Sequence, residues 1–569
     1  MKRRFIRATS VLSTMALTLS ILAACTPAGN TTTTPGGTTT GDIKAPTDGI
    51  VRHNLGADPK TLDPALNTAV DGATVLANTF EGLMRLDEKE QPIPGIAESH
   101  TLSDDLMEYT FNLRDAKWSD GEPVKAGDFK FAWTRALDPN TLPAASEYAY
   151  QLFYIKNAEK FNAGEATADD LGIEVVDDKT LKVTLEAPVA YFLSLMAFPT
   201  YFPVRQDMVE ADVNLWWTKK ETAISNGPFK LESLAPKSEL VLVKNENYYD
   251  ADRVKLNGVI MKLTDDQQTA LAAFRKGEVD MMESPPPQDI PQLVEDGLAE
   301  ILPYLGTYFY VINMRPELEE QNPEVYEALQ KPQVRRALAL AINKTQIVED
   351  VAMGGQEPAW SYVPMGIKDH EGNDFAAANK YLEKDEGDVE EAKRLLEEAG
   401  YPNGEGFPKI TLKYNNNVGH QNIAVAVQAM WKQNLNIDVD LGNEEWAVFQ
   451  TSRINGDYEI ARHGWIADYN DPMTFLDMCV SGEGAGVWGN NDAHYDNPEY
   501  DALIASAKVE ADPAKRTQML HDAEDLLMAD LPVIPVYFYT NIVCYRDYVK
   551  DVRKSALGTT YFDNAFIQE

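Results

Sequence analysis

In the C-terminal half of the chain, stretches with the hydrophobic spacing of a strand alternate with stretches that have the spacing of a helix. Strand-like hydrophobic runs cover residues 410–414, 437–441 and 458–466, and helix-like spacing covers residues 421–434 and 445–454 between them. This order predicts parallel strands joined by right-handed crossovers. Because ligands bind beyond the carboxyl ends of such strands, the residues just after the last strand are candidates for a binding site.

The N-terminal half predicts a further mixture of strands and helices. A strand begins near Ile50, and residues 74–83 have the spacing of a short amphipathic helix. Residues 109–129 predict an alternating strand, a turn at Asp120 and Gly121, and the start of a helix. The chain as a whole therefore predicts an α/β protein.

One pair of opposite charges is prominent in the stretch YEIARHGWIADYNDP, residues 458–472. Arg462 lies within the last predicted strand, and Asp468 lies just after it. A guanidinium binds a carboxylate by a bidentate fork, and a carboxylate binds an ammonium. In an extended chain the two residues are at most roughly 20 Å apart, a distance that suits a short peptide with free ends. An aspartate before Tyr-Asn-Asp-Pro is also typical of a turn, so both roles stay open.

The first 49 residues have the composition of a secreted, tethered protein. Residues 1–24 combine four basic residues with an apolar run that is too short and too polar to span a membrane, which is typical of a secretory signal. The sequence LAAC at residues 22–25 resembles the lipobox of bacterial lipoproteins, which makes Cys25 the expected lipidation site. Residues 25–49 are rich in Thr, Pro and Gly and predict a flexible tether. An ordinary signal peptide with a chance cysteine is the alternative.

Composition narrows the class of protein further. With 569 residues, of which 44% are hydrophobic, the chain is long enough for two or three domains. Without the four basic residues of the signal, the net charge changes from −38 to −42, and no basic stripe is visible, so we expect no nucleic acid partner. Cys479 and Cys544 are far apart in the sequence and predict two free, buried thiols.

The sequence lacks the motifs of common enzymes and metal sites. It contains no Walker A, HExxH or GxSxG motif, and its seven histidines show no zinc-ligand spacing. Residues 484–489, GAGVWG, fit GxGxxG, but the residues that follow do not predict a helix, so we interpret them as a loop. We therefore expect no catalytic residue, no metal and no cofactor.

Four motifs carry a resemblance to a known family. They are YTFNLRDAKWSDGEPVKAGDF at residues 109–129, NGPF at 226–229, NENYYD at 245–250 and VRRALALAI at 334–342. The chain resembles the family 5 solute-binding proteins of ABC importers, which include oligopeptide-, dipeptide- and nickel-binding proteins. The similarity extends from about residue 50 to the C-terminus.

The resemblance implies a three-domain α/β architecture. Family members have the periplasmic-binding-protein fold, in which a hinge joins two lobes, with an additional domain inserted in the first. Carried over to this chain, lobe I comprises residues 50–80, 206–305 and 537–569, the inserted domain II comprises 81–205, and lobe II comprises 306–536.

Within the family, the chain looks closest to the oligopeptide-binding proteins. The motifs LKYNNNVGHQNIA, NEEWAVFQTSR and YEIARHGWIADYNDP carry this similarity. It implies that Asp468 pairs with the peptide α-ammonium and that His420, Arg453 and Arg462 meet the carboxylate at positions that depend on peptide length. Apart from the resemblance, the two arginines equally fit surface ion pairs, and His420 fits a helix cap.

Aromatic and main-chain groups complete the expected site. Main-chain groups of Gly464 and Ile466 are candidates for bonding the peptide backbone by strand addition. By resemblance, the walls of the side-chain pockets include Trp446, Trp465 and one of Tyr148 or Tyr150, between which the sequence does not decide.

The chain departs from the enteric members of the family at three positions. Those members carry a cysteine in each of two motifs where this chain has Gly306 and Ile466, so that disulfide is missing here. A lysine of those members falls near Ala352 in this chain. Anchoring of the shortest peptides by their carboxylate is therefore in question.

The expected function is that of a monomeric, lipid-anchored extracytoplasmic receptor that is not an enzyme. It would capture short peptides and deliver them to an ABC permease and its ATPase subunits. Dipeptides, nickel chelates, haem and signalling peptides are alternative ligands of the same fold. A secreted hydrolase or an adhesin is the alternative of another class, and the missing nucleophile motifs argue against the hydrolase.

Overall fold

The structure is a computed structural model that describes residues 43–482 and 490–569. Residues 43–569 form one compact unit. Cys25, the predicted signal peptide, residues 25–42 of the predicted tether and the GAGVWG segment lie outside the described residues. The prediction for the tether needs one correction, since Ile43 packs against the core. A Cβ atom placed on Gly277 would lie 2.7 Å from Cγ2 of Ile43.

A mixed sheet of eleven strands is the main element of the described residues. Its order is β15 (Val439–Glu444), β14 (Ile410–Asn415), β16 (Ile460–Ile466), β12 (Ala299–Ile312), β17 (Val533–Tyr545), β11 (Met281–Glu283), β1 (Ile50–Asn54), β10 (Gly258–Lys262), β9 (Glu239–Lys244) and β8 (Phe229–Ala235), with β13 (Glu357–Pro358) also paired to β17. A separate antiparallel sheet has the order β4 (Ala97–Leu102), β5 (Glu108–Leu113), β7 (Thr180–Thr184) and β6 (Ile173–Asp177). The α/β prediction is confirmed.

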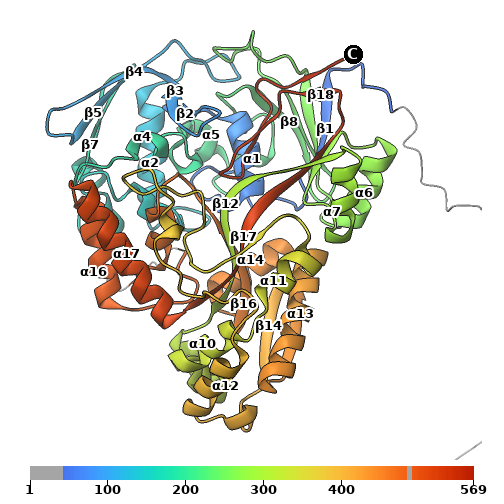
Figure 1. Cartoon of the computed structure of the whole chain (residues 1–569). Helices are drawn as coiled ribbons and strands as arrows, with labels where there is room; N and C mark the ends of the chain where they lie inside the picture. Colours follow the sequence, from blue (N-terminus) through green and yellow to red (C-terminus); the bar gives the residue numbers. More distant parts are fainter. Residues whose placement is uncertain (1–42, 483–489) are drawn as a thin grey trace, which may run out of the picture. The chain divides into compact units, whose positions relative to one another are not determined.

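Two long strands connect the halves of the main sheet. β12 has 14 residues and β17 has 13, and they lie side by side through its middle (Figure 1). Their register shifts between Pro303 and Thr307, and Thr307 then pairs with Phe538. Irregularities of this kind bend paired strands. The predicted lobe boundaries, at residues 305/306 and 536/537, fall beside this break.

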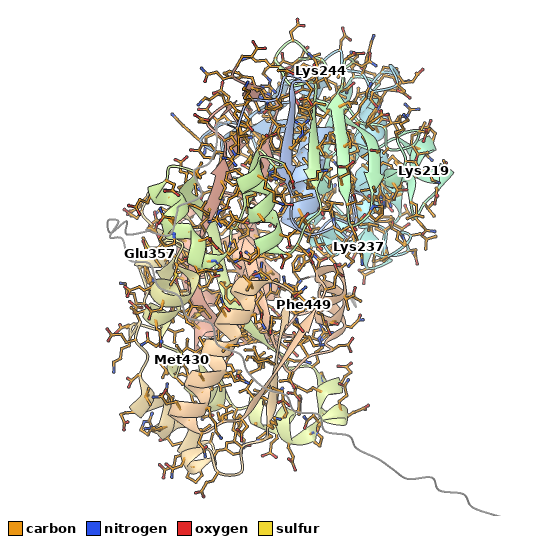
Figure 2. The ribbon with its side chains drawn as sticks, turned by 90° about the vertical axis from the view of Figure 1, so that its right-hand side faces the viewer. Lys219, Lys237, Lys244, Glu357, Met430 and Phe449 are labelled. Atoms are coloured by element: carbon orange, nitrogen blue, oxygen red, sulfur yellow. The ribbon has the colours of Figure 1, made fainter. Side chains whose placement is uncertain are left out.

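The C-terminal strands and helices follow the predicted order. β14 pairs in parallel with β15 and with β16, and α13 (Val418–Leu435) and α14 (Trp446–Asn455) form the two crossovers. Figure 2 marks these helices by Met430 and Phe449, at the opposite end of the sheet from β9, marked by Lys244. The N-terminal helix, in contrast, is shifted from its predicted range of residues 74–83. It is α1 (Val70–Thr79), and the chain becomes extended at Phe80.

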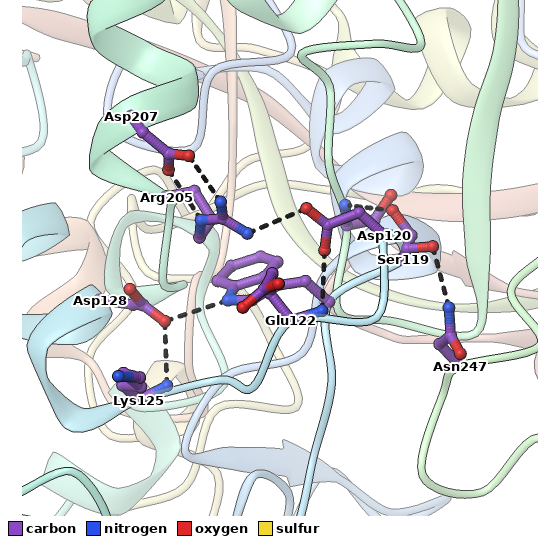
Figure 3. Close-up of polar contacts among 10 residues, drawn as sticks. Ser119, Asp120, Glu122, Lys125, Asp128, Arg205, Asp207 and Asn247 are labelled. Carbon is purple, nitrogen blue, oxygen red and sulfur yellow. Dashed lines mark hydrogen bonds and ion pairs between the residues drawn. The ribbon is translucent and has the colours of Figure 1, made fainter.

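The motif at residues 109–129 has a structural role. The buried Trp118 indole donates to Asp128 Oδ2 at 3.0 Å, at the start of α2 (Ala126–Leu137). Asp120 Oδ2 accepts from Arg205 Nη1 at 3.1 Å (Figure 3). The carbonyl of Ser119 accepts from Asn247 Nδ2 at 3.0 Å. The bond from Asn247 attaches the segment that carries the smaller sheet to the loop after β9. The motif therefore identifies the fold rather than the ligand.

The described residues have three further features. Cys479 and Cys544 are both buried and free, as predicted. None of the helices among the described residues combines the length and apolarity needed to cross a bilayer. The described part of the chain also holds no group of three or more side chains suited to bind a metal ion.

A buried carboxyl group on α17 (Pro513–Asp530) makes the stability of the protein depend on pH. Glu524 Oε1 accepts from the main-chain N–H groups of Tyr362 and Val363 at 3.1 and 2.8 Å, and burial raises the pKa of Glu524 to about 7. Between pH 4.5 and 7 the folded state therefore holds a proton that the unfolded state has released. The stability contributed by this group is full below about pH 4.5 and falls as the pH rises through 7.

Glu524→Gln should therefore stabilise the protein at high pH. Glutamine keeps the acceptor oxygen and removes the buried charge, so we expect a gain on the order of 2–3 kcal/mol at pH 8 and little change at pH 5. Differential scanning calorimetry at both pH values measures this. An equal shift in melting temperature at pH 5 and pH 8 would show that ionisation of Glu524 is not the cause.

Candidate functional site

A cavity of about 470 Å³ lies between α1 and the ends of β16, α13 and α14. Its lining includes nine of the ten predicted site residues: Tyr148, His420, Trp446, Arg453, Arg462, Gly464, Trp465, Ile466 and Asp468. The tenth, Tyr150, is outside the lining and stacks on the ring of Tyr148 at a centroid distance of 5.9 Å. The structure thus places Tyr148 rather than Tyr150 at the cavity.

Asp468 lies two residues beyond the end of β16, and its carboxylate has neutral partners only. Tyr148 donates its hydroxyl to Oδ1 at 3.2 Å, and Gln151 donates Nε2 to Oδ2 at 2.6 Å. No Lys, Arg or His side chain of the described residues lies within 4 Å of it. Burial without a cation raises the pKa of Asp468 to about 8. Without a ligand the carboxyl group is thus held in position and mostly protonated at pH 7, and a ligand cation beside it would favour its ionised form.

Arg462 is a cation without a carboxylate partner among the described residues. Its Nη2 donates to the Tyr539 hydroxyl at 2.7 Å, its Nη1 approaches Asn415 Oδ1 at 3.5 Å, and its buried Nε has no acceptor. The missing side chain of Gly464 makes this arrangement possible, since a Cβ atom there would lie 2.3 Å from the Tyr539 hydroxyl oxygen. The guanidinium is therefore free to pair with a ligand carboxylate.

Arg453 lies in the same wall but is already paired. Its Nε is 2.7 Å from Asp492 Oδ2, and His463 Nε2 is 3.1 Å from the same oxygen. The charge of Arg453, with the hydrogen bond from His463, holds the pKa of Asp492 below its ordinary value despite its burial. The charge of Arg453 is thus compensated inside the protein, in contrast to that of Arg462.

His420 lies in the first turn of α13 and does not cap the helix. The cap is Asn417, whose side chain accepts from the His420 N–H at 3.1 Å. Burial, with Arg462 nearby, lowers the pKa of His420 well below its ordinary value. A neutral imidazole meets a carboxylate only as a hydrogen-bond donor, so the structure makes Arg462 the stronger anchor of the two.

The edge of β16 that faces the cavity is open for part of its length. β14 pairs only with the first two residues of β16. On the side of β12, Ala467 N donates to Leu305 O. Residues that bond the neighbouring strand alternate with residues that do not in an antiparallel pair. The main-chain groups of Gly464 and Ile466 therefore point away from β12. His463 Nδ1 accepts from the Gly464 N–H at 2.7 Å. The Gly464 carbonyl and both groups of Ile466 are then available to a ligand backbone.

Two tryptophans line the cavity, as the resemblance implies. Trp465 is buried, lies against Tyr148 at a centroid distance of 6.1 Å, and has no acceptor for its Nε1. Trp446, the first residue of α14, donates Nε1 to Asp71 Oδ2 at 3.1 Å. This bond joins α14 to α1 across the cavity.

Sequence reasoning missed three polar residues of the site. Gln151 bonds Asp468, Tyr539 bonds Arg462, and Asp71 accepts from Trp446. Their partners lie 317, 77 and 375 residues away in the sequence. No local spacing could reveal such pairs. The only hint in the sequence was that Gln151 directly follows Tyr150, which was a candidate site residue.

The positions at which the chain departs from the enteric members are also at the site. Gly306 and Ile466 are partners in the β12–β16 register, and a Cβ atom on Gly306 would lie 2.3 Å from Ile466 Cδ1. Ala352 lies in the cavity lining. Gly306 and Ile466 therefore adjoin, and Ala352 contributes a methyl group to the wall of the cavity.

Comparison with known proteins agrees with this architecture. The chain is 37% identical, over its full length and the full length of the relative, to the oligopeptide-binding protein OppA of Bacillus subtilis. The Haemophilus influenzae OppA structure in complex with RPPGFSPFR is 32% identical and has a TM-score of 0.81, with 92% of this chain and all of that chain covered.

The structure of an unliganded relative in an open form shows how the arrangement of the lobes affects the comparison. A murein tripeptide-binding protein, MppA, in its unliganded open form is 33% identical over 92% of this chain and 98% of that chain, but its TM-score is 0.62. The lower score, at similar identity and coverage, shows that the described lobes are arranged more like those of the ligand complex. The model for bacterial extracellular solute-binding proteins, family 5, matches residues 91–487, and the chain belongs to that family.

Proposed function

We propose that this protein captures short peptides between two closing lobes and delivers them to the membrane permease of an ABC importer. One observation carries the proposal: among the described residues, a single cavity holds a carboxylate without a cation, Asp468, and a guanidinium without an anion, Arg462. Burying either charge unpaired is unfavourable, so the complementary ligand carries an ammonium and a carboxylate. The open edge of β16 between them suits the amide groups of a peptide.

The names of the relatives support peptides as the ligand class. The Bacillus subtilis relative is an oligopeptide-binding protein, and MppA is a murein tripeptide-binding protein. Main-chain recognition ignores side-chain identity, and bridging water can replace direct bonds in the side-chain pockets. Broad selectivity follows for most positions of the peptide.

The proposal includes a hinge. We place it where β12 and β17 shift register, with lobe I at residues 50–80, 206–305 and 537–569, domain II at 81–205 and lobe II at 306–536. Only these two strands and their neighbours need to bend when the lobes close. The bonds of Asp468 to Tyr148 and Gln151, and of Trp446 to Asp71, form on closure because each joins two domains.

The remaining parts of the proposal concern the cell. Lipidation of Cys25 would anchor the monomeric protein on the outer face of the membrane, where the Thr/Pro/Gly tether gives it reach. The protein would act as a binding component without catalysis, and ATP hydrolysis would belong to its partner subunits. These features are consistent with a family of extracellular solute-binding proteins.

Binding of peptides with blocked ends tests the proposal. Isothermal titration calorimetry should detect tri-, tetra- and pentapeptides with free ends, and acetylation of the N-terminus should strongly weaken binding at every length. Mass spectrometry of ligands that co-purify with the recombinant protein should identify short peptides. Equal binding of acetylated and free peptides, or no binding of any peptide, would refute the proposed function.

A further inference from the structure

The charges of the cavity do not cancel. The charged residues in its lining are Asp71, Asp265, Glu283, Arg453, Arg462 and Asp468. Glu283 is paired with Lys554 at 2.6 Å and Arg453 with Asp492 at 2.7 Å. Asp265 is exposed to solvent. Two carboxylates and one guanidinium therefore remain without an opposite charge. A peptide with free ends balances Asp468 and Arg462 and leaves Asp71 unpaired.

Asp71 is held firmly but is not neutralised. It lies in the first turn of α1, where Oδ1 accepts from the Gly72 N–H at 2.7 Å and Oδ2 accepts from Trp446 Nε1 at 3.1 Å. No Lys, Arg or His of the described residues lies within 4 Å of its carboxylate, and the nearby Asp58 adds a like charge. Burial raises the pKa of Asp71 to about 6, so the group is mostly ionised at pH 7.

A second buried acceptor lies on α14, the helix that carries Trp446. Gln450 is 3% exposed, lines the cavity, and has no donor for its Oε1 among the described residues. It is four residues after Trp446 on α14, so the two side chains lie on one face of the helix. This acceptor is independent of the start of α1. Together, Asp71 and Gln450 provide two oxygen acceptors beside the ring of Trp446, and a ligand there would supply the additional donors.

We propose that Asp71, Trp446 and Gln450 form a side-chain subsite that selects a peptide carrying one lysine or arginine residue. A lysine ammonium or an arginine guanidinium provides donors only, pairs with the carboxylate and attracts the face of an aromatic ring. Such a peptide has two positive groups, which balance Asp468 and Asp71, and one negative group, which balances Arg462. This inference rests on the proposed function, and it adds a preference to it.

Matched peptides test the subsite. Isothermal titration calorimetry would compare Ala-based tri- and tetrapeptides that carry lysine at each position in turn with the same peptides carrying norleucine, which has a similar chain without the charge. We expect the lysine peptide to bind about tenfold to a hundredfold more tightly at one position at least. Asp71→Asn should remove this preference, so that lysine and norleucine peptides bind the variant with affinities within about threefold of each other. Asp265→Asn, which removes an exposed carboxylate from the same cavity, should leave the preference intact.

The outcomes separate this inference from the proposed function. If alanine and norleucine peptides bind but lysine gives no advantage at any position, the subsite is refuted and the proposed function stands. If Asp71→Asn weakens all peptides equally, Asp71 serves only to hold Trp446 in the closed form, and the subsite is again refuted. If no peptide binds, both fail. Thermal unfolding of each variant shows whether it is folded at the temperature of the titration.

Discussion

Asp468→Ala should weaken the binding of a short peptide by about 3–5 kcal/mol, the usual effect of leaving one charge of a buried pair without its partner. The peptide ammonium would be enclosed with Tyr148 and Gln151 as its nearest polar neighbours, and neither carries a charge. The corresponding change in the dissociation constant is at least a hundredfold. Titration calorimetry with free tri- and tetrapeptides measures it, and an affinity within twofold of the wild type would exclude Asp468 as the anchor.

The acetylated peptide serves as the matched control for this variant. Because it has no ammonium, wild type and Asp468→Ala should differ little in their weak affinity for it. The folded state should not suffer, since burial raises the pKa of Asp468 to about 8 and the variant removes an unfavourable buried group. A large fall in melting temperature would instead assign the residue a structural role, as a turn former.

Arg462→Gln should weaken peptides with a free C-terminal carboxylate by about 2–5 kcal/mol, as truncation of one partner of a buried charge pair does at other interfaces. The guanidinium lies against Tyr308 and Tyr539 and has no carboxylate of its own among the described residues. C-terminal amides of the same peptides should bind wild type and variant alike. The comparison uses peptides of two to five residues, because we expect the position of the carboxylate in the cavity to change with peptide length. Equal losses for acids and amides at every length would contradict the assignment.

Arg453 provides the contrasting variant. Arg453→Gln leaves Asp492 buried with His463 as its remaining partner, and burial lowers the pKa of His463 to about 4, so that histidine is neutral at pH 7. We therefore expect a lower melting temperature, whereas Arg462→Gln should leave it unchanged or raise it. Peptide affinity and stability thus separate two arginines that the sequence presents as equivalent.

The local sequence predicted those parts of the fold that depend on neighbouring residues. The succession of strands and helices from β14 to β16 follows from hydrophobic periodicity, and all five elements occur within a few residues of their predicted bounds. The helix predicted at residues 74–83 was shifted, because its apolar residues continue into the extended segment that begins at Phe80. Tertiary packing, rather than helical spacing, determines where that helix ends.

The site itself was only partly within reach of the sequence. The family resemblance pointed to Asp468, Arg462, His420 and Trp465, and each lies at the cavity. It did not point to Gln151, Tyr539 or Asp71, which hold the predicted residues in place. Hydrogen-bond partners of this kind depend on which distant segments the sheet brings together.

By itself, the sequence determined the order of the elements in the C-terminal half and the position of Asp468 just beyond a strand, because each follows from local pattern. Only the tertiary structure decided which charges remain unpaired. Arg453 and Arg462 lie on adjoining elements with similar surroundings in the sequence, yet Asp492 neutralises the first and nothing in the described residues neutralises the second. The attraction between two charges weakens with distance, so an ion pair forms only between groups that the fold brings within a few ångströms. The order of residues in the chain does not contain these distances.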